Sequence, residues 1–145
     1  MRLLILNGPN LNLLGRRETH IYGSASMESC MEDLRAAHPG MELIYRQSNC
    51  EGVLIDLLQE YGYGAVDGIV LNAGGYTHTS VALADAIAAI EVPVVEVHVS
   101  QPAAREEFRH RSLIAGVCAG SIAGFGLGSY VLAVDWFVNI RKTRL

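Results

Sequence analysis

Short, strongly apolar runs alternate along this chain with segments long enough to form a helix, and this alternation is the main constraint on its fold. The first run, Arg2–Asn7, contains four consecutive aliphatic residues, which is typical of a strand buried on both faces. Four more strands are expected on similar grounds: Met41–Gln47, Ile69–Asn72, Val94–Val99 and a strand within Val117–Phe125.

Amphipathic stretches occupy the intervals between these runs. Five helices are expected. The first runs from near Ser26 to Pro39-Gly40, the second from about Glu51 to Gly62–Gly64, and the third begins near Ser80. A short fourth helix lies near Ala103–Phe108, and the fifth runs from about Ser129 to Arg141. Strands joined through helices form a parallel sheet covered by helices on both faces. Five strands in 145 residues predict a single α/β domain, residues 1–145, with a flavodoxin-like three-layer fold.

Composition narrows the function. Half of the residues are hydrophobic and 18% are charged, which suits a packed domain and not a disordered chain. The net charge of −4 gives no general basis for binding nucleic acid or an anionic membrane, and neither partner is expected. Ten of the eleven basic residues are arginines, and the only lysine, Lys142, is close to the end of the chain. Schiff-base catalysis and phosphate binding by a P-loop lysine are therefore disfavoured.

The three cysteines, Cys30, Cys50 and Cys118, form no CxxC motif, so we expect neither a disulfide framework nor a zinc site, and we expect a cytoplasmic protein without a signal peptide. One uncharged stretch, Ser112–Val134, approaches the roughly 20 residues that span a bilayer and has glycine at every fourth position from Gly116. The stretch is explained equally well as a strand, a glycine turn and the first half of a helix in a soluble domain. We favour this interpretation over a membrane span.

Polar residues follow the expected strands where those strands end. In an open parallel sheet, ligands bind beyond the carboxyl ends of the strands. The polar tracts at these ends are Asn7–Asn10, Gln47–Asn49, Asn72–Gly75 with Thr77–Ser80 after it, and the Glu96–Ser100 region. The sequence therefore predicts one crevice that gathers all of them.

The fourth strand carries the most informative pattern. Glu96, His98 and Ser100 alternate with valines and so share one face of the strand. Buried polar groups cost free energy unless they are paired. A histidine held by a carboxylate is suited to general acid–base catalysis, although a purely structural Glu–His pair explains the pattern as well.

The other tracts are weaker signals when taken singly. Glycines in Asn72–Gly75 let backbone N–H groups approach an anion in front of a helix N-terminus, but asparagine and glycine are also ordinary turn residues, and His78 also suits a helix cap. Arg105 is interpreted as part of a solvated face of ion pairs, whereas Arg109 is a candidate for reaching the crevice.

A long loop, from Gly8 to about Ser24, contains Arg16, Arg17 and Tyr22 and has the length of a lid. A solvated basic loop is the simpler explanation for two arginines alone. Lowering the pKa of a phenol from about 10 to near 7 requires about 4 kcal/mol. One arginine at about 4–5 Å supplies up to about 3–4 kcal/mol at an effective dielectric constant of 20. One or two arginines are therefore enough to make this tyrosine a base.

Together these tracts resemble one known family, in order and over the full length of the chain. They are Asn7-Gly8-Pro9-Asn10-Leu11-Asn12-Leu13-Leu14-Gly15-Arg16-Arg17-Glu18 with Tyr22-Gly23, Arg46-Gln47-Ser48, Asn72-Ala73-Gly74-Gly75-Tyr76-Thr77-His78-Thr79-Ser80, Glu96-Val97-His98-Val99-Ser100 and Ala104-Arg105-Glu106-Glu107-Phe108-Arg109. The chain resembles the type II 3-dehydroquinate dehydratases. The resemblance implies a flavodoxin-like fold, a homododecamer of four trimers, and dehydration of 3-dehydroquinate to 3-dehydroshikimate, in the shikimate pathway or in quinate breakdown, without metal or cofactor.

The resemblance also implies residue roles. Tyr22 is the base that removes the C2 proton, Arg17 lowers its pKa and closes with the lid, and Asn10 holds a water that stabilises the enolate. His98 is the acid that protonates the leaving C1 hydroxyl, and Glu96 orients its ring. The implied substrate-binding groups are Asn72 with the backbone N–H groups of Val99 and Ser100 for the carboxylate, His78 and Arg109 for the ring hydroxyls, and Asp85, which reaches a neighbouring subunit's site.

Two positions depart from the family pattern: Gln101-Pro102-Ala103 after Ser100, and Asn49 where an acid is common. Neither position has an implied catalytic role. There are two alternative functions. One is a flavodoxin-like binding or signalling module, and the other is a metal- or serine-dependent hydrolase that uses Glu96, His78, His98 and Ser80 or Ser100. A flavin-binding module would need a Ser/Thr-rich phosphate loop after the first strand, and a phosphoryl receiver would need acidic residues there. This chain has Asn-Gly-Pro-Asn at that place instead.

Overall fold

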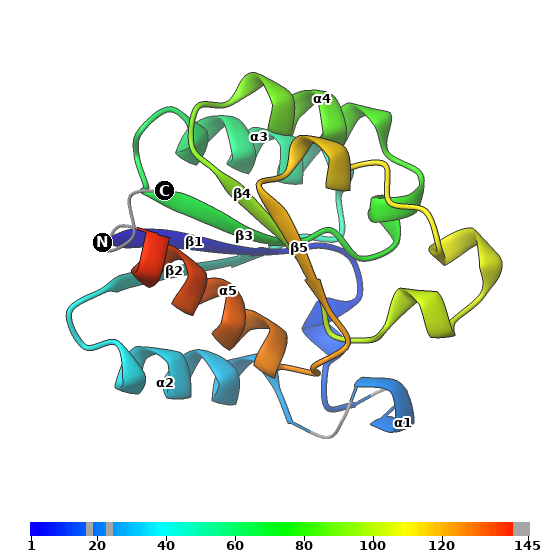
Figure 1. The fold of residues 1–145 in the computed structure, drawn as a ribbon, viewed down its shortest axis with the longest axis horizontal. Helices are drawn as coiled ribbons and strands as arrows, with labels where there is room; N and C mark the ends of the chain where they lie inside the picture. Colours follow the sequence, from blue (N-terminus) through cyan, green and yellow to red (C-terminus); the bar gives the residue numbers. More distant parts are fainter. Residues whose placement is uncertain (17–18, 23–24, 141–145) are drawn as a thin grey trace.

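Five parallel strands form one sheet in the order β2-β1-β3-β4-β5 (Figure 1). The strands are β1 Arg2–Asn7, β2 Glu42–Gln47, β3 Gly68–Asn72, β4 Val94–His98 and β5 Gly120–Ala123. The structure, a computed structural model, describes residues 1–16, 19–22 and 25–140, with the backbone only at 19 and 22. The predicted flavodoxin-like layout is confirmed.

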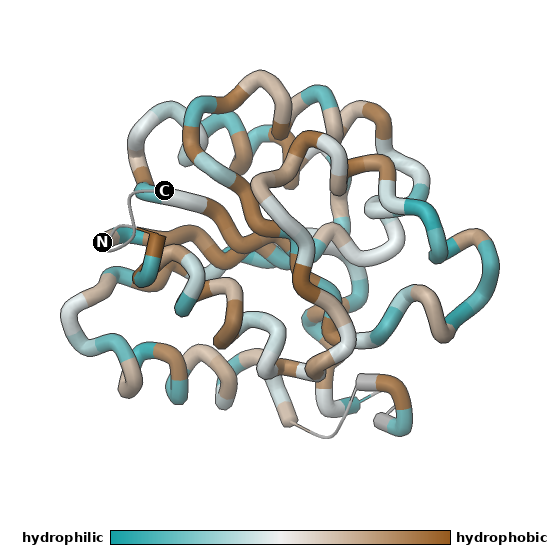
Figure 2. Tube along the Cα trace, viewed as in Figure 1, coloured by the Kyte–Doolittle hydropathy of each residue, from teal (hydrophilic) through white to brown (hydrophobic). Residues whose placement is uncertain are grey.

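Helices cover both faces of the sheet. α2 Met27–Ala37 and α5 Gly128–Ile140 pack on one face, and α3 Glu51–Gly62 and α4 Val81–Ala89 pack on the other (Figure 1). Each face has its own hydrophobic core, and the hydrophobic residues follow the strands through the middle of the molecule (Figure 2).

The apolar run in β1 supplies both cores. Leu3 and Ile5 point to the α2/α5 face, Leu4 and Leu6 point to the α3/α4 face, and all four side chains are fully buried. A strand between two helical layers needs apolar residues at every position, because side chains alternate between its faces. This requirement explains the continuous run that predicted the parallel sheet.

Serine side chains begin two of the helices, as the sequence predicts. The Ser26 hydroxyl accepts a hydrogen bond from the Ser29 N–H at 3.2 Å before α2, and the Ser80 hydroxyl accepts one from the Leu83 N–H at 2.9 Å before α4. Such caps satisfy donors that a helix leaves unpaired in its first turn.

The expected helix at Ala103–Phe108 is wrong. The segment instead forms two 3₁₀ turns, η3 Pro102–Ala104 and η4 Glu107–Arg109, separated by the extended backbone of Arg105. Pro102 starts the first turn, but Arg105 has φ −107° and ψ −164°, which no helix contains.

The expected long loop after β1 also has structure. It contains the 3₁₀ turn η1 Leu11–Leu13 and the short helix α1 Thr19–Tyr22. The uncharged stretch 112–134 divides into the turn η5 Ala115–Val117, strand β5 and the first half of α5. Across the described residues, none of the helices is both long and apolar enough to cross a bilayer.

Candidate active site

A pocket opens where β1, β3 and β4 end, at the carboxyl edge of the sheet. It has a volume of about 120 Å³, which is several times the roughly 10–15 Å³ that one water needs. The described lining residues are Pro9, Asn10, Leu11, Leu14, Asn72, Gly74, Gly75, His78, His98, Val99, Ser100, Pro102, Arg105 and Arg109. They include two arginines and two histidines but no carboxylate, although both arginines also pair with the exposed Glu106 next to the pocket, at 3.8 and 2.8 Å, so the lining itself suits an anionic ligand.

The structure brings most of the predicted site residues to this pocket. Those that line it are Asn10, Asn72, His78, His98, Val99, Ser100 and Arg109. Glu96 lies behind His98 and is 1% exposed. Asp85 is exposed on α4 and does not line the pocket of its own chain. Arg17 and the side chain of Tyr22 lie outside the described residues.

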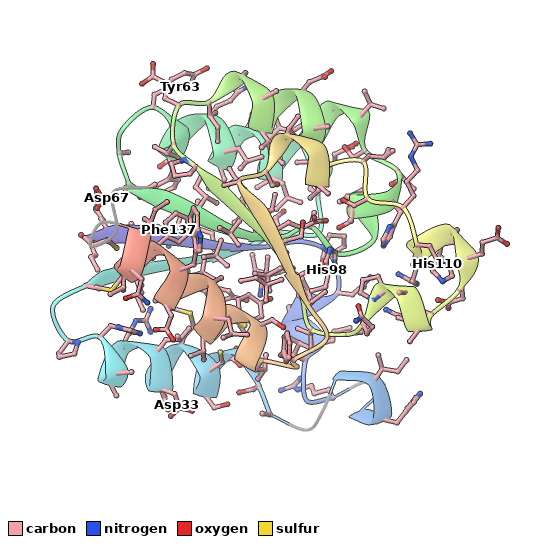
Figure 3. The ribbon with its side chains drawn as sticks, in the orientation of Figure 1. Asp33, Tyr63, Asp67, His98, His110 and Phe137 are labelled. Carbon is pink, nitrogen blue, oxygen red and sulfur yellow. The ribbon has the colours of Figure 1, made fainter. Side chains whose placement is uncertain are left out.

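His98 and Glu96 form a close pair at the end of β4, where Figure 3 places His98 beside the sheet edge. His98 Nε2 is 2.9 Å from Glu96 Oε1, and the side chain of His98 is 12% exposed. Burial by itself raises the pKa of the Glu96 carboxyl, but hydrogen bonds from His98, Ser112 and Ser121 outweigh this effect, so the pKa is lowered. Glu96 is therefore a buried carboxylate that stays ionised.

The pairing fixes which ring nitrogen of His98 is available. Because an ionised carboxylate can only accept, Nε2 carries a hydrogen and donates it to Glu96. Nδ1 is then left for a ligand. The rings of His78 and His98 are stacked, with centroids 6.3 Å apart. His78 Nδ1 donates to the Arg111 carbonyl at 2.7 Å, which likewise leaves its Nε2 for a ligand.

Asn72 is fixed by a buried chain of neutral groups. Its Nδ2 donates to the Tyr130 hydroxyl at 3.0 Å, and that hydroxyl donates to Asn7 Oδ1 at 2.8 Å. Its Oδ1 accepts the Gly74 N–H at 3.2 Å. An amide nitrogen carries two hydrogens, so the second Nδ2 hydrogen of Asn72 can serve a ligand in the pocket.

The turn after β1 places Asn10 at the pocket. Asn10 has φ +69°, a left-handed conformation that asparagine tolerates better than most residues. Its backbone N–H donates to Asn49 Oδ1 at 2.9 Å, and Gln47 Nε2 donates to the same oxygen at 3.1 Å. Asn49, noted above only as a departure from the family, thus supports the backbone of a predicted site residue.

Gly8 allows this turn to approach the neighbouring strand. A Cβ atom at Gly8 would lie 2.5 Å from the Ala73 carbonyl oxygen, closer than any side chain permits. The Gly8 N–H donates to the Asn72 carbonyl at 2.7 Å. The two asparagine turns that follow β1 and β3 are therefore packed directly against each other.

Sequence reasoning misinterpreted one lining residue and missed three others that support the site. Arg105 does pair with Glu106, at 3.8 Å, but it is not solvated: its side chain is 13% exposed, lines the pocket and donates to the Ser100 hydroxyl at 3.4 Å. The backbone of Arg105 is extended, so the helical face expected from the sequence does not form there. Ser112, Ser121 and Tyr130 belong to no motif, so only their position next to a polar strand end identifies them.

Comparison with known proteins shows the family of this chain. The family model described as dehydroquinase class II matches residues 1–138. The chain belongs to the class II dehydroquinase family. The predicted resemblance to the type II 3-dehydroquinate dehydratases is confirmed, and with it the enzyme class.

Individual relatives of this dehydroquinase are similar over nearly their whole length. A 3-dehydroquinate dehydratase from Exiguobacterium sp. is 56% identical over 99% of both chains, and one from Carboxydothermus hydrogenoformans is 51% identical over 99% of this chain and 94% of that protein. The crystal structure of type II dehydroquinase from Butyrivibrio crossotus superposes with a TM-score of 0.91 at 43% identity, covering 95% of this chain and 97% of the other.

Proposed function

We propose that this dehydroquinase converts 3-dehydroquinate into 3-dehydroshikimate through an enolate, with Tyr22 as the base and His98 as the acid. The observation that carries the proposal is the His98–Glu96 pair, which lies at a pocket lined by cationic and neutral groups. This arrangement supplies a proton donor next to a binding site for a carboxylate.

The first chemical step belongs to Tyr22. A phenolate removes the C2 proton of the substrate, and the electron pair moves to the C3 ketone oxygen as an enolate. Asn10 holds the water that hydrogen-bonds this oxygen, and one such donor contributes about 3–4 kcal/mol to the transition state. Arg17 favours the phenolate, and Arg105 adds a second cation to the lining of the pocket.

The second step belongs to His98. The enolate electrons re-form the ketone and expel the C1 hydroxyl, which takes a proton from His98 Nδ1 and leaves as water. The ring must carry both protons to act in this way, and the adjacent carboxylate of Glu96 stabilises the resulting positive charge. Before the next cycle Tyr22 releases the proton that it took to solvent, and His98 Nδ1 takes one up from solvent.

Substrate binding uses the two fixed asparagine turns and the segment after β4. Asn72, with the backbone N–H groups of Val99 and Ser100, binds the carboxylate, while His78 and Arg109 bind the ring hydroxyls. The second Nδ2 hydrogen of Asn72 and Nε2 of His78 are suited to these roles, because their other polar atoms already have partners in the protein.

We further propose that the enzyme is a cytoplasmic homododecamer built from four trimers. Asp85 lies exposed on α4, away from the pocket of its own chain, which is the position required of a residue that completes a neighbour's site. Sedimentation velocity measures the assembly directly: a twelve-subunit species supports the proposal, and a monomer with full activity contradicts it.

The reaction is tested by adding 3-dehydroquinate in metal-free buffer and following absorbance of the conjugated enone product. Tyr22→Phe and His98→Ala are each expected to lower kcat by at least a hundredfold, the lower end for a lost general acid or base. Tyr63→Phe is the matched control, because Tyr63 is 57% exposed and lies well away from His98 (Figure 3). No product from the wild-type enzyme would contradict the reaction, and a fully active Tyr22→Phe would contradict the base.

A further inference from the structure

Glu96 receives hydrogen bonds from three separate segments of the chain. His98 Nε2 donates to Oε1 at 2.9 Å from β4 itself, and the Ser112 hydroxyl donates to the same oxygen at 2.6 Å from the segment after η4. The Ser121 hydroxyl donates to Oε2 from β5. Both carboxylate oxygens of Glu96 therefore have donors, and only one of these donors belongs to the proposed reaction.

This arrangement is needed because the carboxylate is buried. An ionised group removed from water is unfavourable unless hydrogen bonds replace its lost hydration. The other titratable group facing Glu96 is the thiol of Cys118, which stays neutral: burial and then the charge of Glu96 raise its pKa to about 12. Ser112 and Ser121 are thus the neutral donors that let the charge remain on Glu96.

The charge and the position of Glu96 control His98. A neutral carboxyl group would carry its own proton and could donate it to Nε2 of His98, and it would no longer supply the negative charge that stabilises the doubly protonated ring. A carboxylate that can rotate would leave Nε2 of His98 without a fixed acceptor. Holding Oε2 through Ser121 keeps Oε1 directed at His98.

We propose that Ser112 and Ser121 are positioning residues that hold Glu96 ionised and oriented, so that His98 presents Nδ1 to the substrate. The inference rests on the proposed role of His98 as the acid. Ser112 and Ser121 lie in segments that contain no recognised motif, and Ser121 is on the edge strand of the sheet.

Ser121 is the cleaner residue to test. Ser112 also accepts hydrogen bonds from the Ile114 and Ala115 N–H groups, so its loss disturbs the turn as well as Glu96. Ser121 is exposed on β5, and its hydroxyl is described with a single partner, Glu96. Ser121→Ala therefore removes one donor and little else.

The experiment measures kcat, KM and the pH profile for Ser121→Ala and Ser121→Thr. Ser121→Ala is expected to lower kcat about tenfold with KM within twofold, because substrate contacts remain and the loss is one hydrogen bond to a charge. The acid limb of the kcat profile is expected to move to higher pH, because Glu96 protonates more easily without Ser121. Ser121→Thr keeps the hydroxyl and is expected to restore both values.

Ser80→Ala is the matched control, since Ser80 also donates to a carboxylate, that of Glu51, outside the pocket lining. It is expected to lower stability through loss of the α4 cap while leaving the acid limb of the profile in place. An unchanged kcat and acid limb in Ser121→Ala would overturn the inference, and so would a threonine variant as impaired as the alanine variant.

A structural readout separates this inference from the proposed function. The ¹⁵N chemical shifts of the His98 ring report its tautomer: an Nε2–H ring is expected in the wild type and a mixture in Ser121→Ala. If His98→Ala keeps wild-type activity, the acid assignment fails whatever Ser121 does. If His98→Ala is inactive while Ser121→Ala keeps the wild-type profile and tautomer, only the inference fails.

Discussion

Two buried polar clusters meet the pocket from opposite faces of the sheet, and they differ in charge. On the α2/α5 side, Asn7, Asn72 and Tyr130 form a neutral cluster in which every member is at most 3% exposed. On the α3/α4 side, Glu96 and His98, with Ser112 and Ser121, form a charged cluster.

The difference between the clusters matches the tasks proposed for them. Substrate binding needs amide groups at fixed positions and no change of charge, so a network of amides and one phenol is sufficient. Burial raises the pKa of Tyr130 far above its usual value, so this network stays neutral throughout the working range. Proton transfer needs a group that changes charge, and the charged cluster surrounds that group with a carboxylate and its donors.

The largest expected effect is the loss of the charge in the second cluster. Glu96→Gln keeps the size of the side chain but removes the negative charge that stabilises doubly protonated His98. We expect kcat to fall by about a hundredfold, since general acid catalysis contributes about 10²–10⁴-fold, with little change in KM. Steady-state kinetics at pH 7 checks this result. An equal rise in KM would mean that the charged cluster binds substrate, and the distinction between the clusters would fail.

Tyr130→Phe makes the corresponding change in the neutral cluster. It leaves Asn7 Oδ1 and one Asn72 N–H buried without a partner, and each lost partner costs about 1–3 kcal/mol. We expect the free energy of unfolding to fall by about 2–4 kcal/mol and the Tm by roughly 6–12 °C. Urea and thermal unfolding check the loss, which should be equal at pH 6 and pH 8. KM should rise more than kcat falls, in contrast to Glu96→Gln.

The two clusters also show which parts of the fold and of the site can be predicted from the sequence. The parallel sheet follows from β1, where Leu3–Leu6 require two helical layers, and the crevice follows from the polar tracts at the strand ends. Glu96 and His98 follow from alternation within one strand. Periodicity is a local signal, and it identifies residues that share a face of one element.

The partners that complete each cluster come from distant segments without a periodic pattern. Tyr130 lies 58 residues from Asn72, and Ser121 lies 25 residues from Glu96. Arg105 was misjudged because the helix pattern around it fails at its own extended backbone. Such contacts depend on how the helices pack on the sheet, which sequence spacing does not determine.

The two clusters can also be distinguished in the absence of substrate, by how the free energy of unfolding depends on pH. The pKa of Glu96 is lower in the folded state than its ordinary value of 4.5. Its contribution is therefore fully present above about pH 4.5 and is lost as pH falls through the lower folded value. The stability difference between wild type and Glu96→Gln should shrink over that acid range, whereas the difference between wild type and Tyr130→Phe should stay constant. Urea unfolding from pH 7 to pH 3 measures both, and two parallel curves would contradict the assignment of charge.

The smallest expected effect is a change in the reaction rate of one cysteine thiol near each cluster. Burial, and then the charge of Asp33, raises the pKa of Cys30 to about 11, while Cys118 beside Glu96 reaches about 12. Cys50 is exposed, so a disulfide reagent at pH 8 should modify Cys50 first, and Cys50→Ser should remove that fast phase. In the Glu96→Gln background, Cys118 loses its charged neighbour and should react faster, whereas Cys30 on the opposite face should not change. Equal acceleration of both thiols would instead indicate general loosening of the fold, and the clusters would then not be electrostatically independent.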